Sequence, residues 1–380
     1  MVGLFWLNGA AWSSIVPRYP EIKDALGLSN AWWGLVVGLG PIGGLIAGLL
    51  TARLMRRFSS ANVAVVAQVA GICLLLLLGT APWAWLFAAG LFAMAAMDSL
   101  TDIAMNSHGL RVQKAYGRSI LNTFHGWWSI GAVSGGLIGA ACAQARVPLL
   151  VQCLGAVVLF GAMSIGTRTL LLPGPDATPE QHAGAGVRGL GSVPRGIWLR
   201  VLALGVLGAS IGGIEDVGAS WGAVYMVEVY AAVPFVAGLA FVALQGAQTI
   251  GRLTGDRVVD RLGAQRTVTL GAALAGVGML AAVLVGNQWF MLVGFACAGL
   301  GIAVSIPMAM HAADELPGLA PGVGLTVVTW LMRVGFFVSP PLIGALGEVM
   351  PLRWALLVVP VAAAAVVVLA PALRPVRRAP

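Results

Sequence analysis

The sequence predicts an all-α integral membrane protein, in which twelve transmembrane helices form two pseudo-symmetric six-helix bundles with both termini in the cytoplasm. Three observations support this fold class. The chain is strongly apolar, its apolar residues fall into twelve segments with a polar linker in the middle, and its basic residues gather in alternate loops. Together these observations exclude a soluble fold.

The composition is that of a membrane protein. Of the 380 residues, 59% are hydrophobic and only 9% are charged, whereas a soluble domain carries about 25% charged residues. The first apolar segment follows no basic region, so we expect no cleaved signal peptide. Segments long enough to cross a bilayer are predicted at 2–17, 31–50, 61–80, 83–107, 122–145, 148–172, 197–225, 232–251, 267–286, 289–311, 322–346 and 352–373.

A polar stretch divides these segments into two sets of six. The stretch LPGPDATPEQHAGAGVRGLGSVPR is rich in proline and glycine, which is typical of a flexible linker. We therefore expect an N-terminal six-helix bundle at 1–172, a cytoplasmic linker at 173–196, and a C-terminal six-helix bundle with a short basic tail at 197–380.

Two pairs of matching segments indicate that the halves are duplicates. SGGLIGA (134–140) matches SPPLIGA (339–345) at an offset of 205 residues, and ARLMRRF (52–58) matches DRVVDRL (256–262) at an offset of 204. The members of each pair occupy corresponding places in the two halves. Parallel repeats of this kind are typical of transporters whose binding site lies between the repeats, near the middle of the membrane.

The basic residues predict the orientation. With a cytoplasmic N-terminus, seventeen of the 22 Lys and Arg residues fall on cytoplasmic loops, linker and tail, while four fall outside. Such an excess is typical of the cytoplasmic side. The net charge of +8 is scattered singly over these loops, so topology explains it and we expect no nucleic-acid partner.

Several features argue against an enzyme. The four histidines (108, 125, 182 and 311) show no metal-ligand spacing, and an HExxH motif is absent. The four cysteines lie inside apolar segments without CxxC spacing, which predicts neither a disulfide nor a metal site. The sequence has no GxxxxGK[ST] loop for ATP. We therefore expect transport to draw on a proton gradient, with no bound cofactor.

The stretch MDSLTDIAMN places Asp98, Asp102 and Asn106 on one face of an apolar helix. An acid near the bilayer centre costs roughly 2.5–3.5 kcal/mol, which favours a role in an ion or substrate path over structural pairing. The other ionisable residues at membrane depth are Glu215, Asp216, His125 and Arg333. Four carboxyls thus face one arginine and one histidine, and an unpaired buried carboxyl binds a proton rather than stay charged.

The acids are ranked as proton carriers by their neighbours. Asp102 is the first candidate, because Asn106 and His125 lie at the same depth, and Asp98 is the second. His125 fits two roles equally well, that of a proton-relay group and that of a core histidine whose ring is fully hydrogen-bonded.

Two questions about the second half stay open. Glu215 and Asp216 are about 100° apart around their helix, so one faces the cavity while the other packs or pairs. For Arg333, a standing pair with Glu215 or Asp216 competes with capture of an anionic or hydroxyl-rich substrate by the guanidinium group.

The loop GRLTGDRVVDRLGAQR (251–266) resembles the signature of the major facilitator superfamily, which lies between the second and third helices of a half. The motif residues are Gly251, Arg252, Asp256, Arg257, Asp260, Arg261, Gly263 and Arg266. The resemblance implies that Asp260 pairs across helix ends and holds the cytoplasmic side shut, while Gly263 permits the turn. In the first half, Arg56 replaces the acid and Ser59 the glycine, so the better-formed lock is expected in the second half.

Three further stretches resemble a bacterial branch near the fucose-permease-like members. They are PRYPEIKDALGLS (17–29), DIAMN with HGWWSIG (102–106 and 125–131), and the Glu215–Trp221–Tyr225 spacing in IEDVGASWGAVY. The match of Glu215 to the branch pattern places it before Asp216 as a cavity residue. The resemblance extends over the whole chain and implies a multi-pass protein of the bacterial inner membrane.

In the superfamily, the first and fourth helices of each half line a central cavity, and the second and fifth flank it. This arrangement implies substrate contacts from polar and aromatic side chains on those helices: Asn8, Trp12, Asn106, Trp127, Trp221, Tyr225, Gln245, Gln248, Trp330 and Arg333. Taken singly, each is more often a packing or interface residue. Aromatic faces beside hydrogen-bonding groups suit sugars and other small polar metabolites. Gly131, Gly135 and Gly139 are interpreted as packing residues only.

The predicted function is secondary active transport of a small polar, sugar-like metabolite by alternating access, coupled to protons. The expected partners are the lipid bilayer, the substrate and protons, and the protein is expected to be a monomer. The alternative is proton-driven efflux of a drug or metabolite, which the Gly135–Gly136 step weakens because it lacks the proline of the antiporter signature. A non-transporting receptor on the same fold also stays open.

Overall fold

The computed structural model describes residues 1–374 except 119, 175–193, 318 and 320–321, so most of the predicted linker lies outside the described residues. The first half of the chain forms the α-helices α1 (Val2–Ser13), α2 (Tyr19–Ala25), α3 (Asn30–Gly38), α4 (Gly40–Phe58), α5 (Ser60–Thr80), α6 (Ala84–Tyr116), α7 (Leu121–Gln144) and α8 (Leu149–Thr167). Short 3-10 helices follow α1 (η1, Val16–Arg18) and α8 (η2, Arg168–Leu170).

The second half is also helical throughout its described part. Its α-helices are α9 (Arg195–Ser220), α10 (Gly222–Tyr230), α11 (Pro234–Leu262), α12 (Ala264–Val285), α13 (Gln288–Ile302), α14 (Ser305–Asp314), α15 (Val323–Val349), α16 (Leu352–Ala355) and α17 (Val358–Leu369). The 3-10 helix η4 (Ala370–Leu373) follows α17. This all-helical architecture confirms the predicted structural class.

Helices are the expected result of such an apolar chain, because a bilayer leaves backbone N–H and C=O groups no partners outside the segment. Among the described residues, ten helical stretches are long and apolar enough to cross a membrane: Asn30–Phe58, Ser60–Thr80, Ala84–Tyr116, Leu149–Leu170, Arg195–Ser220, Pro234–Leu262, Ala264–Val285, Gln288–Asp314, Val323–Val349 and Leu352–Leu373. Helices α1 and α7 are not among these ten. They pack lengthwise against each other.

Five predicted segments are broken rather than continuous, and those at 2–17 and 352–373 are among them. Helix α3 ends before Leu39, and Pro41 stands in the first turn of α4, where its missing N–H costs no hydrogen bond. Helix α9 passes to α10 at Trp221, whose φ of −121° is not helical. Helix α13 passes to α14 at Ala303 and Val304.

The loops that contain the repeated motif share one turn geometry. Ser59 ends α4 with a φ of 70°, and Gly263 ends α11 with a φ of 80°. This left-handed region favours glycine because a side chain is strained there. The turn predicted at Gly263 is therefore present, and Ser59 adopts the same conformation at a higher conformational cost.

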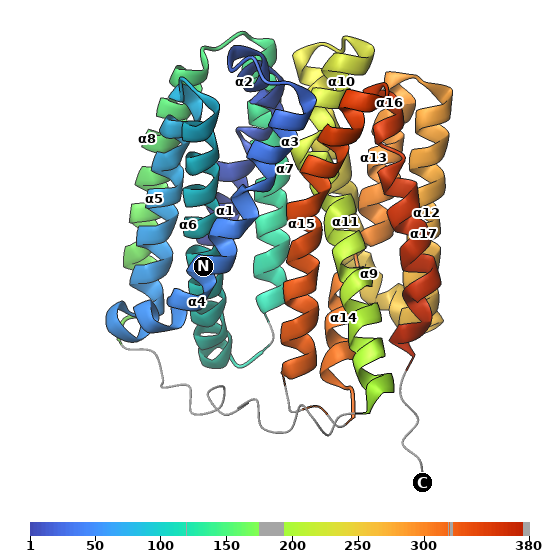
Figure 1. Cartoon of the computed structure of the whole chain (residues 1–380). Helices are drawn as coiled ribbons and strands as arrows, with labels where there is room; N and C mark the ends of the chain where they lie inside the picture. The colour runs from blue at the N-terminus through green and yellow to red at the C-terminus, as the bar shows by residue number, and fades with distance from the viewer. Residues whose placement is uncertain (119, 175–193, 318, 320–321, 375–380) are drawn as a thin grey trace.

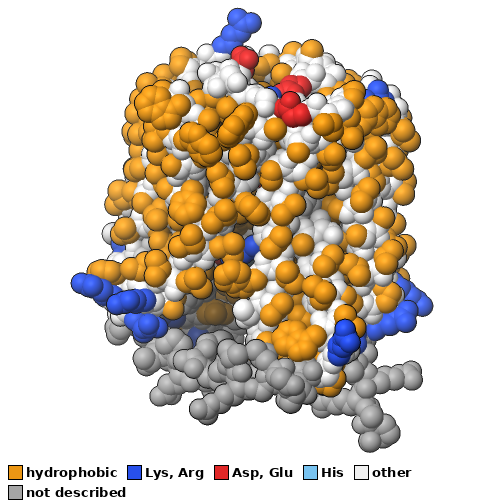
Figure 2. All heavy atoms as spheres, viewed as in Figure 1, with side chains coloured by type: hydrophobic (Ala, Val, Ile, Leu, Met, Phe, Trp, Pro, Cys, Tyr) orange, Lys and Arg blue, Asp and Glu red, His pale blue; other side chains and the backbone are white. Residues whose placement is uncertain are grey.

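The two halves lie side by side, the first from blue to green and the second from yellow-green to red (Figure 1). They contact each other mainly through α3 with α15 and through α7 with α11. We call the end of the molecule with the turns at 58–60 and 262–264 the linker end, and the end with the turns at 81–83 and 145–148 the opposite end. Figure 2 shows an apolar belt between the two ends, with basic side chains gathered at the linker end.

The halves are tied together at the opposite end. Among the described residues, every hydrogen bond between the halves lies there: Lys23 to Glu228 at 2.5 Å, Ala31 N–H to Glu348 at 2.9 Å, Trp33 to the Ser220 carbonyl at 3.1 Å, and Phe235 N–H to Gln144 at 3.2 Å. Toward the linker end, α4 contacts α15 far less extensively than α3 does. Figure 2 shows a recess between the halves near that end.

Candidate substrate and proton site

The first part of the candidate site is a chain of hydrogen bonds that runs from α7 through α1 to α6. Trp128 donates from Nε1 to Asn8 Oδ1 at 2.8 Å, and Asn8 donates from Nδ2 to Asp98 Oδ1 at 3.0 Å. An indole N–H only donates, so this bond fixes the orientation of the Asn8 amide. The nitrogen of Asn8 therefore faces the Asp98 carboxyl group.

A second chain lies one helical turn further along α6. Asn106 donates from Nδ2 to Asp102 Oδ1 at 2.9 Å, and its Oδ1 lies 2.9 Å from His125 Nε2. Because an amide oxygen only accepts, Nε2 of His125 carries the proton in this pair. The His125 ring also packs edge-on against Phe5 at 5.3 Å. His125 therefore reaches Asp102 through Asn106 and not directly.

We call Asn8, Asp98, Asp102, Asn106 and His125 the acid site. The predicted polar stripe on α6 thus meets side chains from α1 and α7, and Asp98, Asp102 and His125 are all exposed in this conformation. Exposed carboxyl groups that also hold fixed hydrogen bonds can exchange protons and bind polar molecules.

Arg333 of α15 reaches across from the second half to the acid site. Its Nη1 lies 3.6 Å from where a Cβ at Gly44 would stand, close to Ser99 of α6. Within the described residues Arg333 forms no ion pair with Asp98 or Asp102, but the guanidinium is near enough for its charge to act on both carboxyl groups. At 3.6 Å an added Cβ would be in ordinary van der Waals contact with Arg333, so the approach does not depend on glycine at position 44.

The second-half acids have other partners. Glu215 Oε1 lies 3.5 Å from Arg252 Nη2 on α11, and Asp216 accepts a hydrogen bond from the Ser220 hydroxyl at 2.8 Å. Within the described chain Arg333 forms no ion pair with either acid. Of the two alternatives for Arg333, the standing pair with Glu215 or Asp216 is therefore not formed in this conformation, because α15 turns Arg333 toward α4 and α6 instead.

Several predicted substrate residues lie in the core of the second half. Trp221 is fully buried and donates to the Pro340 carbonyl at 3.2 Å, while Tyr225 is fully buried and packs against Tyr230. Both make packing contacts in this conformation, so the structure does not place them on a substrate surface. Gln245 and Gln248 of α11 are also buried, at 4% and 0% exposure.

The three remaining predicted aromatic residues are more accessible. Trp12 is half-buried and packs edge-on against Phe241 at 6.0 Å, which joins α1 to α11. Trp127 and Trp330 are 39% and 46% exposed. Neither indole has a hydrogen bond within the described part of the chain, so their role stays a prediction.

The predicted gate motif lies along the last turns of α11 and the start of α12. Gly251 packs against Ala303, where an added Cβ would come within 2.5 Å. Arg252 pairs with Glu215, as described above. Asp256, Arg257, Asp260, Arg261 and Arg266 are exposed. In the part of the chain that the structure describes, Asp260 has no ion pair, so its predicted lock is not engaged in this conformation.

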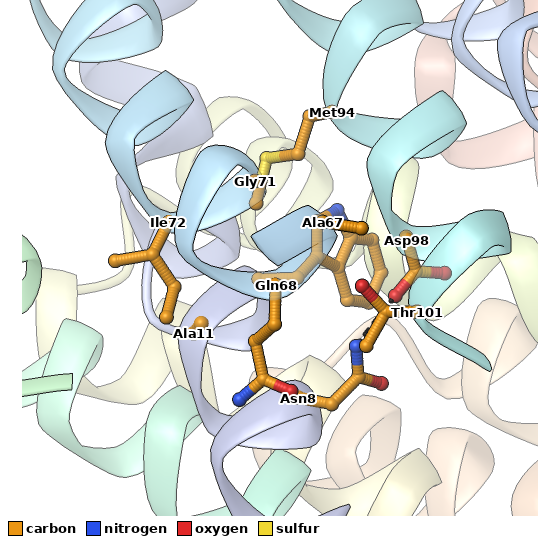
Figure 3. Close-up of a pocket in the computed structure, with 10 residues that line it drawn as sticks. Asn8, Ala11, Ala67, Gln68, Gly71, Ile72, Met94, Asp98 and Thr101 are labelled. Atoms are coloured by element: carbon orange, nitrogen blue, oxygen red, sulfur yellow. Dashed lines mark hydrogen bonds between the residues drawn. The ribbon is translucent and has the colours of Figure 1, made fainter. Parts of the chain in front are cut away.

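Some residues of the site were not predicted from the sequence. Trp128 holds Asn8, and Gln68 of α5 lines a cavity beside Asp98 (Figure 3). Lys23 and Glu228 join the halves at the opposite end. The adjacent pair Trp127–Trp128 was a visible signal, but helical periodicity alone did not tell which indole faces α1.

Comparison with known proteins supports a transporter. Residues 216–380 match the family model of the Major Facilitator Superfamily. The uncharacterised transporter y4wD of Sinorhizobium fredii is 28% identical over 370 residues, which cover 97% of this chain and 96% of the relative. An uncharacterised MFS-type transporter of Yersinia pestis is 28% identical over 351 residues, 90% of this chain and 87% of the relative.

Solved structures share the fold at low sequence identity. The nucleoside transporter NupG has a TM-score of 0.72 at 13% identity, covering 97% of this chain and 96% of its own. A D-xylose–proton symporter has a TM-score of 0.72 at 14% identity, covering 98% and 95%. The transporter FucP in its outward conformation has a TM-score of 0.66 at 17% identity, covering 99% and 98%.

Proposed function

Because the chain belongs to the major facilitator superfamily of membrane transporters, we propose that it moves a small polar metabolite across the bacterial inner membrane by alternating access, coupled to protons. Transport rather than catalysis is its activity. The substrate class, the proton coupling and the membrane are parts of the proposal.

The proposal includes a topology of twelve spans in two six-helix bundles. Helix α1 with η1, and α7, would add two spans to the ten that are long and apolar enough. Helix α7 includes His125 and several hydroxyl residues, which lowers its hydropathy without shortening it. The basic side chains at the linker end (Figure 2) support a cytoplasmic linker and cytoplasmic termini.

The observation that carries the proposal is the approach of Arg333 to the acid site across the two halves. When the halves rock, a residue on α15 changes its distance from α6, so Asp98 and Asp102 gain or lose their positive neighbour. A carboxylate that loses its counter-charge in a low-dielectric site is costly and takes up a proton. Movement of the halves is thereby linked to proton binding.

The substrate is proposed to be small and polar, with sugar-like hydroxyl groups. Asn8, Asn106, His125 and the two acids offer donors and acceptors, and Trp12 lies on the same helix as Asn8. Two of the similar solved structures are named as a nucleoside transporter and a D-xylose–proton symporter, so nucleosides and monosaccharides are the first ligands to test. Melting-temperature shifts on purified protein would identify the ligand, because binding to the native state alone raises its stability.

A variant at Asp102 tests the coupling. In proteoliposomes, Asp102→Asn should abolish accumulation driven by an imposed pH gradient, while counterflow exchange of labelled ligand continues, because exchange needs no net proton release. Asp98→Asn should give the same pattern if both acids share the proton. Asp24→Asn, which changes an exposed acid on α2 outside both the acid site and the gate motif, is the matched control and should keep both activities.

Unchanged gradient-driven accumulation in both Asp98→Asn and Asp102→Asn would remove the acid site from the mechanism. The direction of the flux decides between uptake and the alternative, proton-driven efflux of a drug or metabolite. Efflux would appear as ligand movement opposite to the proton flux.

A further inference from the structure

A small cavity lies inside the first half, next to the acid site, between α1, α5 and α6 (Figure 3). Its polar lining consists of Asn8, Gln68, Asp98 and Thr101. The centre of a water molecule has about 20 Å³ available there, and one buried water needs roughly 10–15 Å³ on this measure. The cavity therefore fits one water molecule and is too small for a metabolite.

Gln68 contributes an acceptor that the described protein leaves unpaired. Its side chain is 3% exposed, and its Nε2 donates to Ser164 Oγ on α8 at 3.0 Å. Its Oε1 is buried and has no hydrogen-bond partner among the described residues. Figure 3 shows the Gln68 amide extending from α5 toward Asn8. Buried acceptors without a partner are rare because their lost hydration is not replaced.

The opposite wall of the cavity supplies a donor. Asn8 Nδ2 carries two protons, and one of them is used in the bond to Asp98. Thr101 is fully buried, and its hydroxyl donates to the Met97 carbonyl at 2.8 Å, which leaves its oxygen free to accept. A buried water typically makes about three hydrogen bonds, and these groups can provide that number.

We propose that this cavity binds one structural water molecule, which donates to Gln68 Oε1 and accepts from Asn8 Nδ2. The water links α5 to the Asn8–Asp98 pair on the side away from the second half. Its role rests on the proposed function: the water positions the Asn8 amide, and this amide in turn positions the Asp98 carboxyl group that takes part in proton coupling.

The cavity suits water better than a metal cation. Hard cations are bound by shells of oxygen ligands, but the Asn8 oxygen is already taken by Trp128, so Asn8 presents its N–H groups. Within the described residues, no group of three His, Cys, Asp or Glu side chains could hold a metal.

Two substitutions separate a wet cavity from a dry one by the sign of a melting-temperature change. Ser164→Ala first removes the partner of Gln68 Nε2. In that background, Gln68→Met should leave the melting temperature unchanged or lower it, because the lost hydrogen bond to the water offsets the gain from removing the unpaired Nε2. If the cavity is dry, the same step replaces a wholly unpaired buried amide with an apolar side chain, and the melting temperature should rise instead. That rise would overturn the proposal.

A density map of the wild-type protein that resolves ordered waters tests the site without any variant. Density within hydrogen-bonding distance of Gln68 Oε1 and Asn8 Nδ2 is expected, and a cavity without density would contradict the proposal. Neither measurement depends on transport. A failure of proton coupling would therefore leave the water site standing, and loss of the water site would leave the coupling test unaffected.

Discussion

Arg333 of α15 lies beside Gly44 of α4, on the first-half side of the contact between the halves. Helical spacing placed it at mid-membrane and identified the acids near that depth. It did not tell which acid is the neighbour, because that depends on how α15 packs against the first half. The Glu215–Arg252 pair contributes to the outcome, because it already occupies Glu215.

Double-mutant cycles test this assignment. Arg333→Gln should couple to Asp98→Asn or Asp102→Asn by about 0.5–3 kcal/mol, the range for neighbouring residues. It should be additive with Glu215→Gln to within about 0.5 kcal/mol, the limit for independent sites. Melting temperatures and ligand affinities of the single and double variants provide the measurement. Strong coupling of Arg333 to Glu215 together with additivity toward Asp98 and Asp102 would restore the sequence expectation.

At the scale of helices, the glycine ladder of α7 shows what a pattern can predict. Gly131, Gly135 and Gly139 were interpreted as packing residues, and added Cβ atoms there would lie 2.1–2.2 Å from carbonyl oxygens of α1 and of Ser14, which follows it. The interpretation is confirmed, since such approach is possible only without a side chain. Small residues repeated at every fourth position predict a close helix contact even when the partner helix is unknown.

The ladder leads to a stability prediction. Gly135→Ala would place a Cβ 2.2 Å from the Ala10 carbonyl oxygen, so α1 and α7 must separate. Overpacking of this kind costs about 1–3 kcal/mol, and the melting temperature should fall by several degrees. Gly155→Ala on α8 is the matched control, because no atom lies within 4 Å of its added Cβ. Equal melting temperatures for the two variants would contradict the packing.

Helix breaks were harder to predict than helices. Ten apolar segments appear as membrane-length helical stretches, because hydropathy alone decides whether a segment can leave water. The breaks at Leu39 and Trp221 depend on local contacts. Pro41 was a visible signal for the first break, whereas Trp221 is held by the Pro340 carbonyl, a partner 119 residues away.

On the scale of the whole molecule, the proposed alternating access requires a second conformation besides the one described here. The halves are hydrogen-bonded at the opposite end, and Asp260 of the gate motif is unpaired at the linker end within the described chain. The sequence predicted the two halves and a gate from repeated motifs. It could not predict which end is closed, because the two conformations of an alternating-access transporter are encoded by the same residues and typically differ by only a few kcal/mol.

The central claim is that ligand movement and proton movement are linked at the acid site. Ligand-dependent proton flux tests it most directly. Liposomes with a pH-sensitive dye inside would contain either wild-type protein or the Asp98→Asn/Asp102→Asn double variant. The metabolite that most raises the melting temperature would then be added. We predict a ligand-dependent change in internal pH for the wild type and none for the double variant. Ligand transport without proton flux in the wild type, or equal flux in both proteins, would contradict the claim.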